Sequence, residues 1–312
     1  MKTIRLAQAY MLAGYPKYAE RAATCGTFLQ FGLDHGGEKH LAAANFCQLR
    51  LCPMCTARRA RWAAFSLSKI MSLAQEVCPG LQYTFLTLTI RNVSGDKLGE
   101  AVGELIRAWY RMTGRRRFEK AVRGWFRAVE ITRSKDGTYH PHIHVVLAVD
   151  PAYFDRKKDL YISQTEWREW WQKSLRADYA PMVRIQAVKD KAGRAQGMAA
   201  ALEAAKYTTK DVEYLSRPLL DGNGVVREKE VQTVRDYTEA LKGRRLTAFG
   251  GCLKDAAKRL KAEDFDKGDL IYADDEIRSD LYELMVTYGW NFGAGDYVLR
   301  DVQSATRAHL DS

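Results

Sequence analysis

The sequence predicts an α+β protein in which antiparallel strands are flanked by helices, with a metal-binding module near the N-terminus. Three observations predict this class: a cluster of cysteines early in the chain, alternating strands of which two are joined by a short turn, and stretches with helical periodicity around them. With 312 residues, the chain has room for two or three small units. We expect a cysteine module with a basic helix at 1–78, a central domain at 79–218, and a partly helical C-terminal region at 219–312.

The N-terminal module is predicted from four cysteines. Cys52 and Cys55 form a Cys-x-x-Cys turn in which two thiolates can bind one zinc ion, and Cys25 and Cys47 can complete a tetrahedron. A redox pair is the alternative, but the preceding strand and the rest of a thioredoxin-like pattern are missing. Because four thiolates leave no open coordination position, we expect a structural Zn²⁺ ion. The two remaining cysteines stand alone and are expected in the core.

A helix is predicted from the end of the cysteine cluster to about Val77, because its apolar residues recur near helical spacing. Its first turns carry several arginines. These can contact DNA phosphates or belong to a packed structural cap, and the spacing leaves both interpretations open.

The chain is basic, with 49 lysines and arginines against 38 acidic residues and a net charge of +11. The basic residues are clustered, which is typical of nucleic-acid surfaces, although a merely soluble basic surface is the alternative. We expect DNA contacts from these residues: Arg58, Arg59, Arg61, Arg115, Arg116 and Arg117. The acidic segment 263–283 is expected to lie away from a polyanion. No signal-peptide pattern or bilayer-length apolar run is present, so we expect a cytoplasmic protein without membrane contact.

Three strands are predicted in the central domain. Residues 85–90 alternate apolar residues with Thr87 and Thr89, and residues 125–132 form a second strand after a helix at 99–112. The third strand, 139–149, has a histidine at every second position, so one face carries His140, His142 and His144. Such a row is either neutral and hydrogen-bonded or holds a metal ion or a phosphate.

The last two strands are expected to form a hairpin, because Lys135–Thr138 is typical of a turn. A two-residue Asp136-Gly137 turn would place Glu130 on the face away from the histidines. A connection with an odd number of residues, with Gly137 in the left-handed conformation, would place Glu130 opposite His144 and Thr132 opposite His142. We expect this second arrangement, with Glu130 as a metal ligand, because an unpartnered buried glutamate is costly. An ion pair at the sheet surface between Glu130 and an arginine such as Arg127 or Arg133 is the alternative.

A further helix is expected at 196–216, which is rich in alanine and contains no proline. One face of it would carry Glu203, Tyr207, Lys210 and Tyr214. These side chains offer a nucleophilic hydroxyl, a proton-accepting carboxylate and an ammonium group. Taken alone, the pattern also fits an ordinary solvated helix face.

Together these segments resemble the rolling-circle replication initiator (Rep) family of small bacterial plasmids, a branch of the HUH endonuclease superfamily. The similar segments, in order, are CGTFLQF, NFCQLRLCPMCTARRA, FLTLT, HPHIHVVL and AAKYTTKDVEYL, with a weaker likeness in ALKGRRLTAFGGCLKD. No single motif is decisive, but the ordered set is highly specific.

The resemblance implies a central antiparallel sheet of HUH type, so that 79–218 would be the nuclease domain. It assigns a catalytic Mg²⁺ or Mn²⁺ to His142 and His144, with the third ligand left open between Glu130 and His140. It further assigns the nucleophile to Tyr207, water activation to Glu203 and, with less support, charge neutralisation to Lys210.

The implied activity is nicking of a plasmid origin through a 5′-phosphotyrosine intermediate, which starts and ends rolling-circle replication. The implied partners are origin DNA, single-stranded or in a hairpin at the nick site, and a host helicase and polymerase. An HUH relaxase or transposase is the nearest alternative. A histidine-triad nucleotide hydrolase and a non-catalytic zinc DNA-binding protein are more distant ones.

Overall fold

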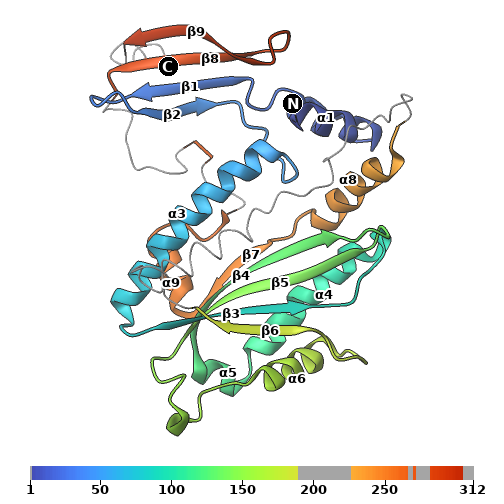
Figure 1. The fold of residues 1–312 in the computed structure, drawn as a ribbon, viewed down its shortest axis with the longest axis vertical. Coiled ribbons are helices and arrows are strands. Elements are labelled where there is room, and N and C mark those ends of the chain that lie inside the picture. The colour runs from blue at the N-terminus through green and yellow to red at the C-terminus, as the bar shows by residue number, and fades with distance from the viewer. Residues whose placement is uncertain (1, 189–225, 266–269, 272–281, 305–312) are drawn as a thin grey trace. The chain divides into compact units, whose positions relative to one another are not determined.

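The computed structural model describes residues 2–188, 226–265, 270–271 and 282–304 (Figure 1). The chain divides into two compact units, one drawn from 1–62, 211–235 and 268–312, the other from 63–210 and 236–267. This grouping runs across the three consecutive ranges suggested by the sequence, because both ends of the chain contribute strands to one sheet. Within the described residues, no helix is both long enough and apolar enough to cross a bilayer.

The first unit contains α1 (Lys2–Leu12), α2 (Pro16–Ala23), β1 (Phe28–Leu33), β2 (Lys39–Ala44), β8 (Leu284–Asn291) and β9 (Asp296–Ser304). The second contains β3 (Gln82–Thr89), α4 (Gly95–Thr113), α5 (Arg116–Ala121), β4 (Val122–Arg133), β5 (Tyr139–Val149), η1 (Arg156–Lys158), α6 (Gln164–Leu175), β6 (Val183–Ala187), β7 (Thr247–Gly250) and α9 (Gly251–Arg259). Two helices, α3 (Pro53–Val77) and α8 (Glu228–Leu241), have residues in both units.

The second unit is built on an antiparallel sheet with the strand order β6-β3-β5-β4-β7. The predicted elements are present: α3, β3, α4 and the β4–β5 hairpin all form close to the expected positions. The histidine strand, β5, is central and pairs with β3 on one side and β4 on the other. A central strand has neighbours on both edges, so side chains from three strands can meet on one face.

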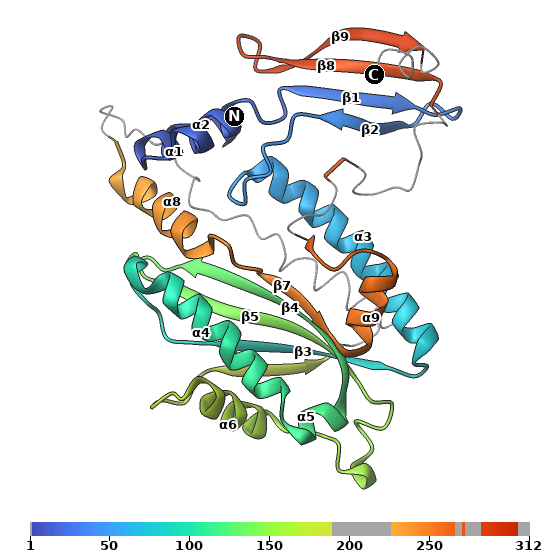
Figure 2. The same cartoon turned by 180° about the vertical axis from the view of Figure 1, so that it is seen from behind.

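One face of this sheet is covered by α4, α5 and α6 (Figure 2). The ring of Trp109 on α4 packs edge-on against Trp125 of β4, with centroids 5.1 Å apart. On β5, Ile143, Val145 and Leu147 are fully buried and share the face of Trp125. The alternate residues of β5, including the histidines, therefore face the other side of the sheet.

The first unit has a second antiparallel sheet with the order β2-β1-β8-β9. Its central pair joins distant parts of the chain, since Phe31 of β1 pairs with Val286 of β8. The sequence did not predict these strands. The expected α+β class is confirmed, with two antiparallel sheets. Of the four clustered cysteines, Cys25 precedes β1, Cys47 and Cys52 lie between β2 and α3, and Cys55 lies in α3.

Candidate metal centres

Three side chains from the β4–β5 hairpin converge on the histidine face of the second unit. Glu130 lies directly opposite His142 in the strand pairing, and His144 follows two residues later on the same face. The carboxylate oxygen Oε2 of Glu130 lies 3.0 Å from Nε2 of His144 and 3.4 Å from Nε2 of His142. All three side chains are nearly buried, with exposed fractions of 6%, 10% and 11% for Glu130, His142 and His144.

The other ring nitrogens fix the orientation of the two imidazoles. Nδ1 of His142 donates to the backbone carbonyl of His140, 3.0 Å away, because a carbonyl oxygen can only accept. Nδ1 of His144 lies 3.3 Å from the hydroxyl of Thr87 on β3. Both Nε2 atoms are thereby directed at the same carboxylate oxygen, which is the arrangement of a metal site whose histidines are held by outer partners.

The donor set fits a divalent cation. Ligands bound about 2.1 Å from an ion at right angles to one another lie about 3 Å apart, close to the separations observed around Glu130. Two imidazoles and a carboxylate suit first-row transition ions, and the carboxylate also suits Mg²⁺ or Mn²⁺. The three side chains can therefore form hydrogen bonds with one another or bind one cation together.

The hairpin register corrects one expectation. Glu130 lies opposite His142 and Thr132 opposite His140, each two residues from the partner that we expected. The loop is Lys135–Gly137, closed by a hydrogen bond from Ser134 N to Thr138 O, with Gly137 at φ 93°. The connection has an odd number of residues, as expected, and the alternative of a two-residue turn is wrong. A shift of two residues keeps every side chain on its face.

The alternative ion pair between Glu130 and Arg127 does not form. Arg127 lies on the opposite face of β4, is 2% exposed, and donates to the carbonyl of Leu246. Burial lowers the pKa of Arg127. The two residues are three positions apart on the strand, and because side chains alternate between faces, they lie on opposite faces of the sheet.

His140 lies at the rim of this centre. Its ring stacks on His142 with centroids 5.2 Å apart and an interplanar angle of 27°. Burial, followed by the neighbouring His142, lowers the pKa of His140, so it is neutral at pH 7. The group of converging ligand atoms comprises Glu130, His142 and His144 but not His140.

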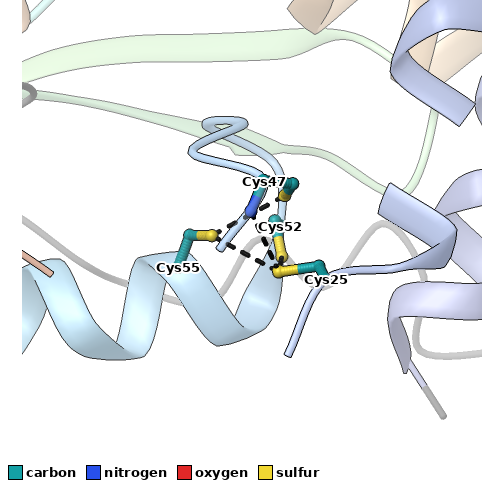
Figure 3. A group of neighbouring side chains, drawn as sticks. All are labelled: Cys25, Cys47, Cys52 and Cys55. Atoms are coloured by element: carbon teal, nitrogen blue, oxygen red, sulfur yellow. Dashed lines mark hydrogen bonds between the residues drawn. The ribbon is translucent and has the colours of Figure 1, made fainter. Parts of the chain in front are cut away.

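The four predicted cysteines also come together, in the first unit (Figure 3). Sγ of Cys25 lies 3.6 Å from Sγ of Cys55 and 3.5 Å from Sγ of Cys52, and Cys47 lies 3.6 Å from Cys55. The group is buried. Hydrogen bonds with Cys25 lower the pKa of Cys52, whereas hydrogen bonds with Cys47 raise the pKa of Cys25. All four thiols cannot ionise together without a counter-charge, which a Zn²⁺ ion would supply.

Comparison with known proteins places the chain in a family. Residues 38–298 match the family Rep_1, described as a replication protein. The chain belongs to the Rep_1 family of replication proteins. The relatives of this Rep_1 chain include Protein rep of Streptococcus pneumoniae serotype 2 (strain D39 / NCTC 7466), which is 35% identical over 96% of this chain and 90% of the relative. Protein rep of Lentilactobacillus hilgardii is 33% identical over 91% and 88%, and that of Bacillus amyloliquefaciens 34% over 92% and 86%. No solved structure gives a significant match.

The arginines expected to contact DNA differ in their surroundings in this Rep_1 protein. Arg59 is 9% exposed and donates to the carbonyls of Leu49 and Gln48, so it holds the loop between two cysteines. Arg58 donates to the carbonyls of Leu270 and Ile271. These contacts hold the two side chains within the protein, and their expected contacts with DNA stay a prediction. Arg61 on α3 is exposed.

The second cluster, Arg115–Arg117, lies at α5, in the layer that covers the face of the sheet away from the histidines. Arg117 pairs with Glu166 and donates to the carbonyl of Tyr161. Arg115 lies over the ring of Trp170, and Arg116 is exposed. The DNA contacts expected of this cluster stay a prediction, and they would involve the side of the sheet away from the histidines.

The helix expected at 196–216, with Glu203, Tyr207, Lys210 and Tyr214, lies outside the described residues. Sequence reasoning also missed two features of the histidine face. It noted Thr87 only as part of an alternating strand, although the same alternation aligns Thr87 with His144. It did not predict β6, although Val183–Ala187 alternates apolar residues with Arg184 and Gln186.

Proposed function

We propose that this Rep_1 protein is a site- and strand-specific DNA endonuclease and strand transferase that starts and ends rolling-circle replication of a plasmid. The observation that carries the proposal is the convergence of Glu130, His142 and His144 on one sheet face, in a chain of a replication protein family. Buried imidazoles directed at a carboxylate favour divalent-ion chemistry on a phosphate over a merely structural histidine row.

In this proposal Glu130, His142 and His144 hold Mg²⁺ or Mn²⁺. A bound divalent cation would polarise the scissile phosphate and offset the negative charge that develops there. The chain's own contribution is to fix the ligands before the substrate arrives. The carbonyl of His140 and the hydroxyl of Thr87 hold the two rings in the orientation of ligands.

Tyr207 is the proposed nucleophile. Its phenol oxygen attacks phosphorus in line, a tyrosine O–P bond forms, and the bond to the 3′ oxygen of the preceding nucleotide breaks. The phenol proton leaves to a base or to water, and the released 3′-hydroxyl serves as the primer for a host polymerase. The 5′-phosphotyrosine conserves the energy of the broken linkage for later rejoining.

Glu203 is proposed as the general base that takes a proton from water when the regenerated origin is cut, so that hydrolysis ends the cycle. Lys210 would neutralise the phenolate or the phosphate. Cys25, Cys47, Cys52 and Cys55 would hold a structural Zn²⁺ ion. In this proposal the DNA at the nick is single-stranded or extruded as a hairpin, the form of DNA that basic and aromatic side chains bind by phosphate contacts and stacking.

The test is incubation of the purified protein with supercoiled DNA carrying its origin and Mn²⁺, followed by gel analysis and peptide mass spectrometry. We expect nicked circles, a nucleotide adduct on Tyr207, and loss of both with EDTA or with Tyr207→Phe. Tyr214→Phe is the matched control and is expected to keep the adduct. An adduct on Tyr214 would refute the assigned nucleophile, and nicking that survives both EDTA and Tyr207→Phe would favour a histidine-triad reaction.

A further inference from the structure

The histidine face of the sheet continues from β5 across β3 to the edge strand β6. His144 of β5 lies opposite Thr87 of β3, and Thr87 lies opposite Arg184 of β6. Side chains directly opposite one another in a sheet share a face, so Arg184 projects on the same side as the metal ligands. Strands lie about 4.8 Å apart, which places the Cα of Arg184 roughly 10 Å from that of His144. An arginine side chain can cover most of this distance.

The other face of β6 is covered. Val183 and Ile185 point toward the layer of α6, which contacts β6. Trp171 of α6 is fully buried and donates from its indole nitrogen to the carbonyl of Thr89, which ties this helix to β3. The edge strand is therefore held in place from behind, while Arg184 and Gln186 are exposed on the histidine side.

Arg184 is also oriented by a neighbour on its own strand. In the amide orientation that satisfies both groups, the oxygen of Gln186 accepts from Nε of Arg184 at 3.1 Å and from Nη2 at 2.7 Å. The second terminal nitrogen remains directed elsewhere. Among the described residues, no carboxylate lies within ion-pairing distance of Arg184. The guanidinium is thus preorganised, and no acidic side chain in the described part of the chain neutralises its charge.

An ordinary solvated arginine would also be exposed, but it would have no reason to lie on the same sheet face as the proposed metal ligands. Met182 lies two residues before Arg184 and is 72% exposed. Its backbone carbonyl accepts from the N–H of Thr89, and Thr89 lies opposite His142. A cation and an apolar side chain thus lie side by side, two strands away from His142 and His144, with β3 between them. This combination suits one nucleotide, with its phosphate on the guanidinium and its base against the thioether.

We propose that Arg184 binds a backbone phosphate of the single-stranded DNA whose scissile linkage lies at the Glu130–His142–His144 centre. The inference rests on the proposed function and adds a residue that positions the strand. Guanidinium groups bind phosphate through two parallel N–H donors, and Gln186 holds the plane of the group for that contact.

The test is binding of a fluorescent single-stranded origin oligonucleotide in EDTA, measured by anisotropy over a series of salt concentrations. Arg184→Ala is expected to weaken binding about tenfold, the loss of one charge-assisted contact. It should also reduce the slope of log K against log salt by about 0.7, the value for one phosphate on a single strand. Arg184→Lys should keep the slope, because the charge remains, while binding weakens.

The matched control is Arg168→Ala, which removes the same charge from the exposed side of α6, behind the sheet. A scan with single methylphosphonate linkages then locates the contact. One neutral linkage should weaken the wild type and leave Arg184→Ala unchanged.

The two proposals fail differently. If the wild type nicks the origin and Arg184→Ala binds the oligonucleotide like Arg168→Ala, the role of Arg184 is refuted and the nuclease stands. If the wild type neither nicks the origin nor binds the oligonucleotide, the proposed function falls and this inference falls with it.

Discussion

Glu130 is the residue on which the histidine centre depends. It is a buried carboxylate on β4, and its Oε2 faces two imidazole nitrogens. A buried carboxylate is stable only when other groups replace the water that it has lost. Nε2 of His144 lies within hydrogen-bonding distance of this carboxylate, and a divalent ion would stabilise the carboxylate with its charge.

Glu130→Gln keeps the shape of the side chain and removes its charge. We expect Mn²⁺ affinity to fall by at least about tenfold, because a neutral amide is a weaker ligand and the two imidazoles alone leave the ion under-coordinated. Calorimetric titration of Mn²⁺ into the protein measures this. Glu119→Gln, at an exposed position on α5, is the control and should bind as the wild type does. Equal affinity in both variants would remove Glu130 from the ligand set.

At the scale of single elements, the Cys-x-x-Cys turn leads directly into α3. Cys52 precedes the helix and Cys55 lies in its first turn, so a bound ion would fix the start of the helix. Arg59, one turn further, holds the preceding loop through the carbonyls of Gln48 and Leu49. Gln48 has φ 58°, and these hydrogen bonds hold it in that uncommon conformation.

Cys52→Ser should therefore release zinc. We expect about one Zn²⁺ per wild-type chain and far less in the variant, with a lower melting temperature for the first unit, because structural zinc contributes directly to folding. Elemental analysis and calorimetry measure both quantities. Cys252→Ser, outside the cluster, should retain the ion. A wild type that contains no zinc and forms a disulfide under air would favour the redox interpretation.

Helix α6, which supports β6, begins with a capping box. The carboxylate of Glu166 accepts from the backbone N–H and the hydroxyl of Ser163, and the N–H of Glu166 donates to that hydroxyl in return. The backbone hydrogen bond from Ser163 is the main cause that lowers the pKa of Glu166, followed by the hydroxyl and the charge of Arg117, while burial opposes them.

A carboxylate whose pKa is lowered on folding stabilises the protein above its unfolded pKa, and this contribution is lost as pH falls through the folded value. Glu166→Gln should thus cost about 0.5–1 kcal/mol at pH 7, and the difference from wild type should shrink below about pH 4. Urea unfolding at several pH values measures it. The neighbouring exposed Glu169→Gln should show no comparable pH dependence, and a cost for Glu166→Gln that stays constant down to pH 3 would contradict the assignment.

The hairpin illustrates what the sequence could and could not predict at this scale. Alternation predicted that Glu130 and the histidines share a face, because any loop with an odd number of residues places them on the same side of the hairpin. The exact partner depended on the loop, where Asp136 accepts from the backbone N–H and hydroxyl of Thr138 and so closes a three-residue turn. Five residues at the edge strand β6 were too short a pattern to stand out, and Arg184 was missed with them.

At the scale of the whole molecule, the sheet of the first unit could not be predicted from local pattern. Its residues are mostly half-buried or exposed on both faces, so apolar and polar positions do not alternate clearly. Its pairing is also remote: Gln30 donates to the hydroxyl of Thr287, 257 positions later. Both sheets are nevertheless antiparallel, and the site that sequence motifs indicated lies on the β4–β5 hairpin, whose two strands are adjacent in sequence.

A chain that ends at residue 283 should lose the first sheet and keep the second. Removal of β8 and β9 leaves β1 paired only with β2, and a two-stranded ribbon is marginally stable in water. We expect early proteolytic cleavage within 28–44, while the fragment carrying β3 to β6 persists. Truncation after residue 304, beyond β9, is the control and should protect both. Equal protection of 28–44 in the two truncated chains would contradict this dependence.

The remote pairing of β1 with β8 also dictates an order of events on the ribosome. A nascent chain exposes β1 and β2 early, and these strands wait for nearly the whole of translation before their partner emerges. The described strands of the other sheet have left the exit tunnel by then, so the histidine face can assemble while the N-terminal ribbon is still open. That ribbon therefore presents an unpaired edge for most of synthesis, the kind of surface that chaperones protect.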